Sequence, residues 1–197
     1  MEPRGRPSYC IWGEGPSPYT PFPGLALSST LDIDSGIFKN ETWSVAAGVD
    51  CPLSSDRRWL LPLGEEAQEI TLEAGTHPVR LSTGDWIHFY AAATPGWVEN
   101  GNYTAGFVIL DRDDPRRVVQ RVSGQWLVPT FDYETLCDGA ANCTYRGERK
   151  NVIFLSSATR MTSSRSTDGD TLRLWFGGGD GNVGTAVVSV KTKQHAY

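Results

Sequence analysis

Four cysteines and three glycosylation motifs are the residues whose spacing most directly suggests chemistry in this 197-residue chain. Cys137 and Cys143 bracket the turn-rich segment DGAAN and could close a local disulfide, although four cysteines allow three complete pairings. No two cysteines have the CxxC spacing of a zinc site, so the sequence predicts no metal centre. The Asn-X-Thr motifs of N-glycosylation begin at Asn40, Asn102 and Asn142.

Three such motifs favour a secretory history, but the N-terminal sequence does not match a secretory signal. The first 19 residues lack the continuous apolar stretch of a signal peptide. The expected location is therefore the secretory pathway if the N-terminus is truncated, and the cytoplasm otherwise.

Charge and aromatic content indicate which partners to expect. The net charge of -5 argues against a nucleic-acid or anionic-membrane surface, and no apolar run approaches the roughly 20 residues that span a bilayer. Seven residues each of Trp, Tyr and Phe accompany 21 Gly and 12 Pro. Most of these rings are expected in a core, and a minority at turns would suit stacking on sugars.

The same abundance of Gly and Pro, with short alternating apolar runs, predicts an all-β fold. Residues 1–24 form a Pro/Gly-rich N-terminal segment whose stretch GEGPSPYTPFPG is predicted to be an ordered loop or a frayed terminus, and 25–197 are predicted to form one domain. Four-stranded antiparallel units recurring about every 40 to 60 residues favour a partial β-propeller of about three blades, with a β-sandwich as the alternative. The expected strands include residues 25–30, 42–47, 58–63, 78–81, 86–92, 103–111, 118–122, 125–130, 151–161, 171–180 and 184–192.

One charged segment, DRDDPRR, interrupts two of these strands. It is predicted to be the turn between one blade and the next, with Asp111 capping the turn, Pro115 fixing φ and the charges facing water. The segment SerThrGlyAsp at 82–85 is predicted to be a hairpin turn.

The order of residues around this segment carries a family resemblance. GFVILDRDDPRRVVQRVSGQWLVPTFDYE resembles the pattern L-L-D-x-D-D-P-x-x-V-x-x-R, ending in Y-E, of glycoside hydrolase family 130, the β-mannoside phosphorylases and related hydrolases. KNVIFLSSA, LRLWFGGGDGNVGTAVVSV and LEAGTHPVRLSTGDWIHFY resemble three further motifs of the family, in the family's order.

The resemblance implies a five-bladed β-propeller with a sugar site at one end of its channel. It runs from about residue 70 to residue 192 and matches the C-terminal part of the family domain. The implied partners are an oligosaccharide or glycan and the missing N-terminal propeller blades.

The resemblance also implies candidate site residues. Glu134, at the family's Y-E position, and Asp180, after the glycines, are the predicted catalytic carboxylates. His77, Asp180 and Tyr90 are the predicted substrate-binding residues. His88 is expected to be structural, since it alternates with Phe89 on a strand. Glu73, on the strand before His77, is a weaker candidate.

Two departures from the family pattern bear on the reaction. Asp114 stands in the Asp-Pro-Arg context of the family's general acid, but its surroundings match a different segment, so the acid role is not assigned to it. Ala91 follows Tyr90 where family phosphorylases have a His near phosphate. The sequence therefore favours hydrolysis of β-mannosides or binding without reaction over phosphorolysis. No cofactor is expected, and inorganic phosphate is the possible co-substrate. The alternative is a non-catalytic glycan-binding or truncated propeller fragment that lacks the acid.

Overall fold

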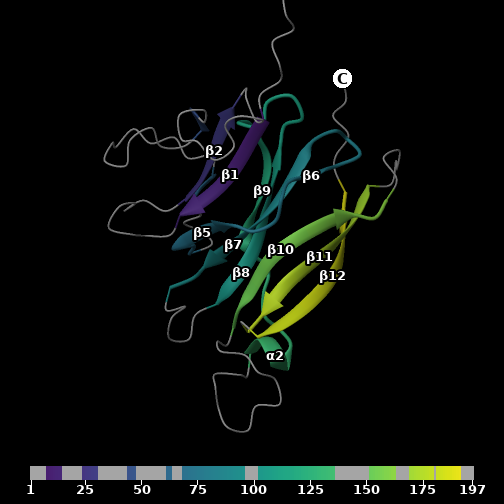
Figure 1. Ribbon diagram of the computed structural model, residues 1–197. Coiled ribbons are helices and arrows are strands. Elements are labelled where there is room, and N and C mark those ends of the chain that lie inside the picture. The colour runs from purple at the N-terminus through teal and green to yellow at the C-terminus, as the bar shows by residue number, and fades with distance from the viewer. Residues whose placement is uncertain are drawn as a thin grey trace, which may run out of the picture.

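Three antiparallel sheets make up the chain in the computed structural model (Figure 1). The structure describes residues 8–14, 24–30, 44–47, 61–63, 68–95, 102–135, 151–162, 169–179 and 181–191, and over the first three of these ranges it describes the backbone alone. The all-β prediction is confirmed, and three stacked sheets fit the partial propeller rather than the two layers of a β-sandwich. No helix among these residues is long and apolar enough to cross a membrane.

The first sheet is built around β2 (Gly24–Thr30), which pairs with β1 (Ser8–Glu14), β3 (Ser44–Ala47) and β4 (Leu61–Pro62). β2, β3 and β4 lie where strands were predicted. β1 was not predicted, and its final two residues extend into the stretch expected to be a loop. Since β1 pairs with β2 over seven residues, part of the Pro/Gly-rich N-terminal segment joins the first sheet.

The middle sheet has the order β5-β7-β8-β9, with β6 also paired to β7. β5 (Thr71–Ala74) and β6 (Val79–Arg80) pair with successive halves of β7 (Trp86–Ala93) and so occupy one strand position. β8 (Tyr103–Leu110) and β9 (Val118–Leu127) complete a blade of four strand positions. The predicted hairpin turn at 82–85 is confirmed: the Leu81 amide donates to the Asp85 carbonyl at 2.8 Å.

The charged segment DRDDPRR does not link two blades, so this part of the prediction is wrong. β8 and β9 pair with each other, and the segment is the turn inside that pair. The cap is as expected, because the Asp111 carboxylate accepts hydrogen bonds from the amides of Asp113 at 2.9 Å and Asp114 at 3.1 Å.

The third sheet contains β10 (Ile153–Arg160), β11 (Asp170–Gly178) and β12 (Asn182–Val190) in that order. The predicted strand at 125–130 is not part of it, because residues 125–127 are the end of β9. A short helix, α2 (Asp132–Thr135), follows β9, although no helix was predicted. Four residues are too few to show a helical period in the sequence.

Alternation along β7 packs the middle sheet on both faces. Ile87 and Phe89 face a core shared with Leu155 and Leu174 of the third sheet, while Tyr90 faces a second core that includes Leu61 of β4. β10 contacts β6, β7 and β8, and β1 and β2 contact β5, so the middle sheet lies between the other two (Figure 1).

Candidate functional site

The helix α2 holds one of the two predicted catalytic carboxylates. Glu134 is the third residue of the helix, and its Oε2 accepts hydrogen bonds from the amides of Thr130 at 2.7 Å and Phe131 at 3.0 Å. A glutamate at this position commonly reaches back to the free amide that precedes the helix. The side chain is therefore fixed by a structural role, and the residue is only 1% exposed.

The other carboxylate oxygen, Oε1, has no hydrogen-bond partner among the residues that the structure describes. The side-chain nitrogen of Asn182, at the start of β12, is likewise buried and without a partner in the described part of the chain. Both atoms belong to residues around Gly178: Asn182 is its partner across the β11–β12 pair, and a Cβ built on Gly178 lies 3.1 Å from Cγ of Glu134. This corner therefore holds an acceptor and a donor that have no hydrogen-bond partner among the described residues.

Two aromatic rings flank the same corner. Phe131 and Tyr133 are stacked with their centroids 5.6 Å apart and their planes within 5°, and Phe131 is 59% exposed. Cβ atoms built on Gly178 and Gly184 would lie 2.8 Å and 3.0 Å from Tyr133, so these glycines provide the space for its ring. Burial, followed by the neighbouring Glu134 carboxylate, raises the pKa of Tyr133.

We call the residues Phe131, Tyr133, Glu134, Gly178 and Asn182 the α2 corner. It combines an exposed aromatic ring with a buried carboxylate oxygen and a buried amide nitrogen. Groups of these kinds recognise the ring face and the hydroxyls of a sugar. The second predicted catalytic residue, Asp180, lies outside the described residues, two positions after Gly178.

The predicted substrate-binding residues His77 and Tyr90 differ in exposure. His77 is exposed, in the segment between β5 and β6. Tyr90 is fully buried in β7, so its ring is not available to stack on a sugar, and the predicted binding role does not fit this position. Its hydroxyl oxygen instead lies 3.1 Å from both Glu69 Oε1 and the Val122 carbonyl oxygen, and either of them can accept its hydrogen bond.

Tyr90 belongs to a polar cluster that sequence analysis missed. Arg121 forms an ion pair with Glu69 and lies 5.7 Å from the centre of the Tyr90 ring, and Glu69 also accepts from the Gly124 amide at 2.7 Å. Burial, together with the Glu69 charge, raises the pKa of the Tyr90 hydroxyl. The sequence could have pointed to Arg121, because this residue is the final one of the matched D-D-P-x-x-V-x-x-R pattern.

A second buried carboxylate, Asp170, ties the middle sheet to the third sheet. Its Oδ2 accepts from both the amide and the hydroxyl of Ser82 at 2.8 Å. Its Oδ1 accepts from Thr162 at 3.3 Å and lies 3.6 Å from the Arg160 guanidinium. Every oxygen of this carboxylate has a protein partner, so the cluster is a structural link and not a free binding group.

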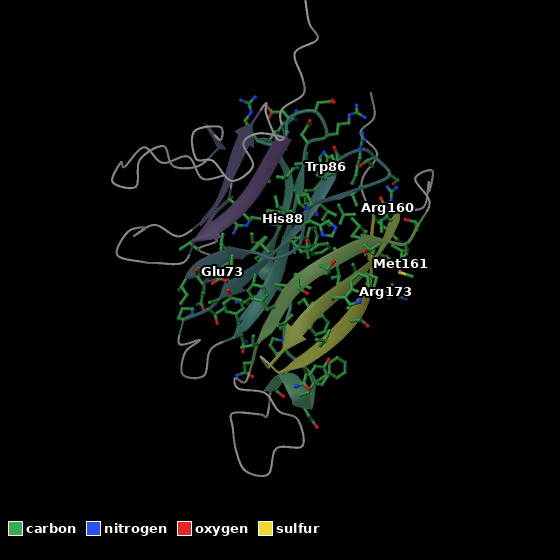
Figure 2. All side chains as sticks on the ribbon, viewed as in Figure 1. Glu73, Trp86, His88, Arg160, Met161 and Arg173 are labelled. Carbon is green, nitrogen blue, oxygen red and sulfur yellow. The ribbon has the colours of Figure 1, made fainter. Side chains whose placement is uncertain are left out.

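His88 is buried in β7 as the sequence predicted, near the centre of the molecule in Figure 2. Neither ring nitrogen has a hydrogen-bond partner in the described part of the chain. The pKa of His88 is lowered to about 4, mainly by burial; the Thr76 backbone opposes this shift, and the nearby His77 adds to it. Glu73, the weaker candidate, is partly buried on β5 and stands well apart from α2 (Figure 2).

Most predicted modification sites lie outside the described residues, namely Cys137, Cys143, Asn40 and Asn142. Asn102 is described and exposed, immediately before β8. No group of three or more His, Cys, Asp or Glu that could hold a metal ion occurs among the described residues.

Known proteins similar to this chain are mannoside phosphorylases. No family model matches the chain. It is 28% identical over 159 residues to the β-1,2-mannobiose phosphorylase of Listeria innocua and 26% identical over 132 residues to the 1,2-β-oligomannan phosphorylase of Thermoanaerobacter sp.. These matches cover 80% and 67% of this chain but 36% and 37% of the relatives, respectively.

Solved structures agree with the sequence matches. The Listeria innocua enzyme in complex with β-1,2-mannobiose superposes with a TM-score of 0.62 at 21% identity, over 92% of this chain and 40% of that one. The chain is therefore similar in sequence to mannoside phosphorylases and similar in fold to family 130 structures. A family 130 structure, from work on hydrolases that target β-1,2-mannosidic linkages, superposes with a TM-score of 0.52 over 84% of this chain and 40% of that one. The family 130 resemblance and the partial propeller are thereby confirmed, and the chain spans about two fifths of the length of these relatives.

Proposed function

We propose that this chain binds β-1,2-linked mannosides at the α2 corner, as the carbohydrate-recognising part of a family 130 propeller. The observation that carries the proposal is the meeting of two family motifs. Glu134, at the family's Y-E position, lies against Gly178, two residues before Asp180 in the glycine-rich motif. The names of the two sequence relatives supply the linkage, because both act on β-1,2-mannosides.

Each group at the corner has a distinct role in this proposal. The exposed Phe131 ring stacks on the C–H face of a mannose ring, with Tyr133 supporting it from behind. Oε1 of Glu134 accepts a hydrogen bond from a sugar hydroxyl, and the Asn182 amide donates one. Asp180 stays a prediction from the sequence for this set, because a carboxylate can accept from two neighbouring hydroxyls and the residue lies outside the described residues.

Cleavage requires a general acid, and the residue that most resembles one does not fit. Asp114 is held by Arg116 within the β8–β9 turn, at 2.7 Å and 3.0 Å, and that hydrogen bond lowers its pKa. A carboxyl that stays ionised cannot supply a proton. Ala91 is fully buried, and no imidazole stands at this position to bind phosphate. We therefore infer that the chain binds β-mannosides, and that single-displacement hydrolysis needs an acid other than Asp114.

The test combines binding with product analysis. The purified chain is titrated with β-1,2-mannobiose by calorimetry, and then incubated with it with and without inorganic phosphate. Saturable binding that is weakened at least tenfold by Glu134→Gln, and unchanged by Asp113→Asn, supports the proposal. Asp113 is the matched control, because its side chain is 84% exposed on a turn. Absence of binding by the folded chain would overturn it.

Product analysis separates binding from the reactions of the family. Free mannose would make the chain a hydrolase and would leave the binding site intact. Mannose 1-phosphate formed only with phosphate would make it a phosphorylase, and would contradict the inference drawn from Ala91.

A further inference from the structure

The third sheet has one strand position fewer than the middle sheet, and its outer strand is β12. β12 pairs with β11 along one edge, and no described strand pairs with its other edge. Its backbone N–H and C=O groups on that side have no strand partner among the described residues. Such an edge is a template for another strand.

Many exposed edge strands carry charges, prolines or bulges that prevent pairing, and the described residues of β12 show none of these three. Its sequence, NVGTAVVSV, has no charged residue and no proline. It pairs with β11 in unbroken register over nine residues, so no bulge twists the edge away. Val183 and Val187 are 83% and 60% exposed on its outer face.

The outer strand of the middle sheet, β9, has the protective features that β12 lacks. β9 includes Arg121, follows the charged DRDDPRR turn, and pairs with β8 through two register shifts. Those irregularities and charges are the usual protection of a free edge. The contrast indicates that β12 is an edge adapted to a partner strand.

We propose that β12 pairs antiparallel with β12 of a second copy of this chain, giving a two-fold dimer with one continuous six-stranded sheet. In a symmetric pair each strand meets its own sequence, and nine uncharged residues avoid the repulsion of like charges. The flanking charges favour the same arrangement. In the sequence Asp180 precedes β12 and Lys191 follows it, so antiparallel pairing brings the acidic end of each strand to the basic end of the other.

The geometry of the pair follows from strand periodicity. With Ala186 at the two-fold axis, Val187 of each copy stands opposite Thr185 of the other, and Val183 stands opposite Ser189. A nine-residue antiparallel pair forms about eight to ten backbone hydrogen bonds, which is within the range of a specific protein interface. This dimer does not depend on the proposed sugar site.

The test is sedimentation equilibrium of the full chain under reducing conditions, which exclude dimers linked by cysteines. We expect a species of twice 21.6 kDa that dissociates on dilution. Thr185→Lys places a charge at the centre of the pair and should raise the dissociation constant at least tenfold. Thr159→Lys, at an exposed position of β10 in the same sheet, should leave it unchanged.

A second measurement covers the case in which Thr185→Lys unfolds the chain. Hydrogen exchange of wild-type β12 amides should slow as protein concentration rises, while that of β9 amides stays constant. A chain that remains monomeric at 200 µM (about a hundredfold above typical micromolar affinities), or one that forms only larger aggregates, would overturn the proposal. So would a dimer that Thr159→Lys disrupts, or concentration-independent exchange in β12.

Discussion

Two buried carboxylates lie at opposite ends of β11, where the third sheet contacts residues of the middle sheet and of α2, and the two groups differ in their hydrogen bonds. At one end Asp170 has hydrogen bonds from Ser82 and Thr162 and an ion pair with Arg160. At the other end Glu134 caps a short helix with Oε2 and leaves Oε1 without a partner in the described part of the chain. A fully satisfied buried carboxylate serves the fold, whereas a half-satisfied one keeps capacity for a ligand.

The difference extends to the surroundings of the two groups. Asp170 lies next to alternating core positions of β11, such as Leu172 and Leu174. Glu134 lies beside the glycines at the other end of that strand and beside an exposed phenylalanine. The two ends therefore make opposite predictions: changes near Asp170 should alter stability, and changes at the α2 corner should alter sugar binding.

The largest expected effect is that of Asp170→Ala. Removing this carboxylate leaves the Ser82 amide without its acceptor and the Arg160 guanidinium without its ion pair, and should lower the free energy of unfolding by about 3 kcal/mol. Urea denaturation followed by circular dichroism measures the loss. Asp113→Ala, at an exposed turn, should stay within about 0.5 kcal/mol. A loss below about 1 kcal/mol for Asp170→Ala would show that the link between the sheets does not depend on this group.

Substitution of His88 tests whether a buried side chain that has no hydrogen-bond partner among the described residues lowers stability when it lies away from the proposed binding site. Its pKa is about 4 in the folded chain against 6.5 ordinarily, so below pH 6.5 the unfolded chain takes up a proton that the folded chain does not. Its contribution is fully present above pH 6.5 and is lost as the pH falls toward 4. Each pKa unit corresponds to about 1.4 kcal/mol, which gives a loss of about 2.5 kcal/mol between pH 7 and pH 4.5.

The measurement is the free energy of unfolding at pH 7 and pH 4.5 for the wild type and for His88→Leu. The variant should lose less stability on acidification than the wild type, by about 2.5 kcal/mol. Thr159→Asn, at an exposed position of β10, is the control and should behave as the wild type does. Equal acid sensitivity of the wild type and His88→Leu would contradict the assignment.

Two substitutions of Glu134 separate the two roles proposed for its side chain, the helix cap and sugar binding. Glu134→Ala removes the helix cap and should cost about 1 to 2 kcal/mol of stability, whereas Glu134→Gln keeps a side-chain oxygen for the cap and should cost less than about 0.5 kcal/mol. Calorimetric binding of β-1,2-mannobiose should fall at least tenfold in both. Full binding by Glu134→Gln would mean that the carboxylate is structural alone.

Phe131→Ala should have the smallest effect on the fold. The ring is 59% exposed, so stability should stay within about 0.5 kcal/mol, while loss of stacking should weaken mannobiose binding several-fold. Phe131→Trp should retain binding because it preserves the aromatic face. A Phe131→Ala variant that binds mannobiose as tightly as the wild type would show that this ring does not contribute to the site.

Local sequence determined the strands of this protein and many of its turns. Alternating apolar residues marked most strands, and the turn at 82–85 and the Asp111 cap depend on residues adjacent in the chain. The matched motifs also indicated the resemblance to family 130, because residue order is retained when overall identity is low. α2 and the cap by Glu134 were missed, since four helical residues leave no periodic signal.

Tertiary structure alone decided which polar residues meet. Nothing in the local sequence joins Glu69 to Arg121, Ser82 to Asp170, or Glu134 to Gly178, because each pair is brought together by strands that are distant in the chain. Tyr90 and His77, thirteen residues apart, were predicted to share a site, and the packing of β7 buried one and left the other exposed. The sequence therefore determined the strands, the turns and the family resemblance, while packing between the sheets decided which carboxylates stabilise the fold and which retain capacity for a ligand.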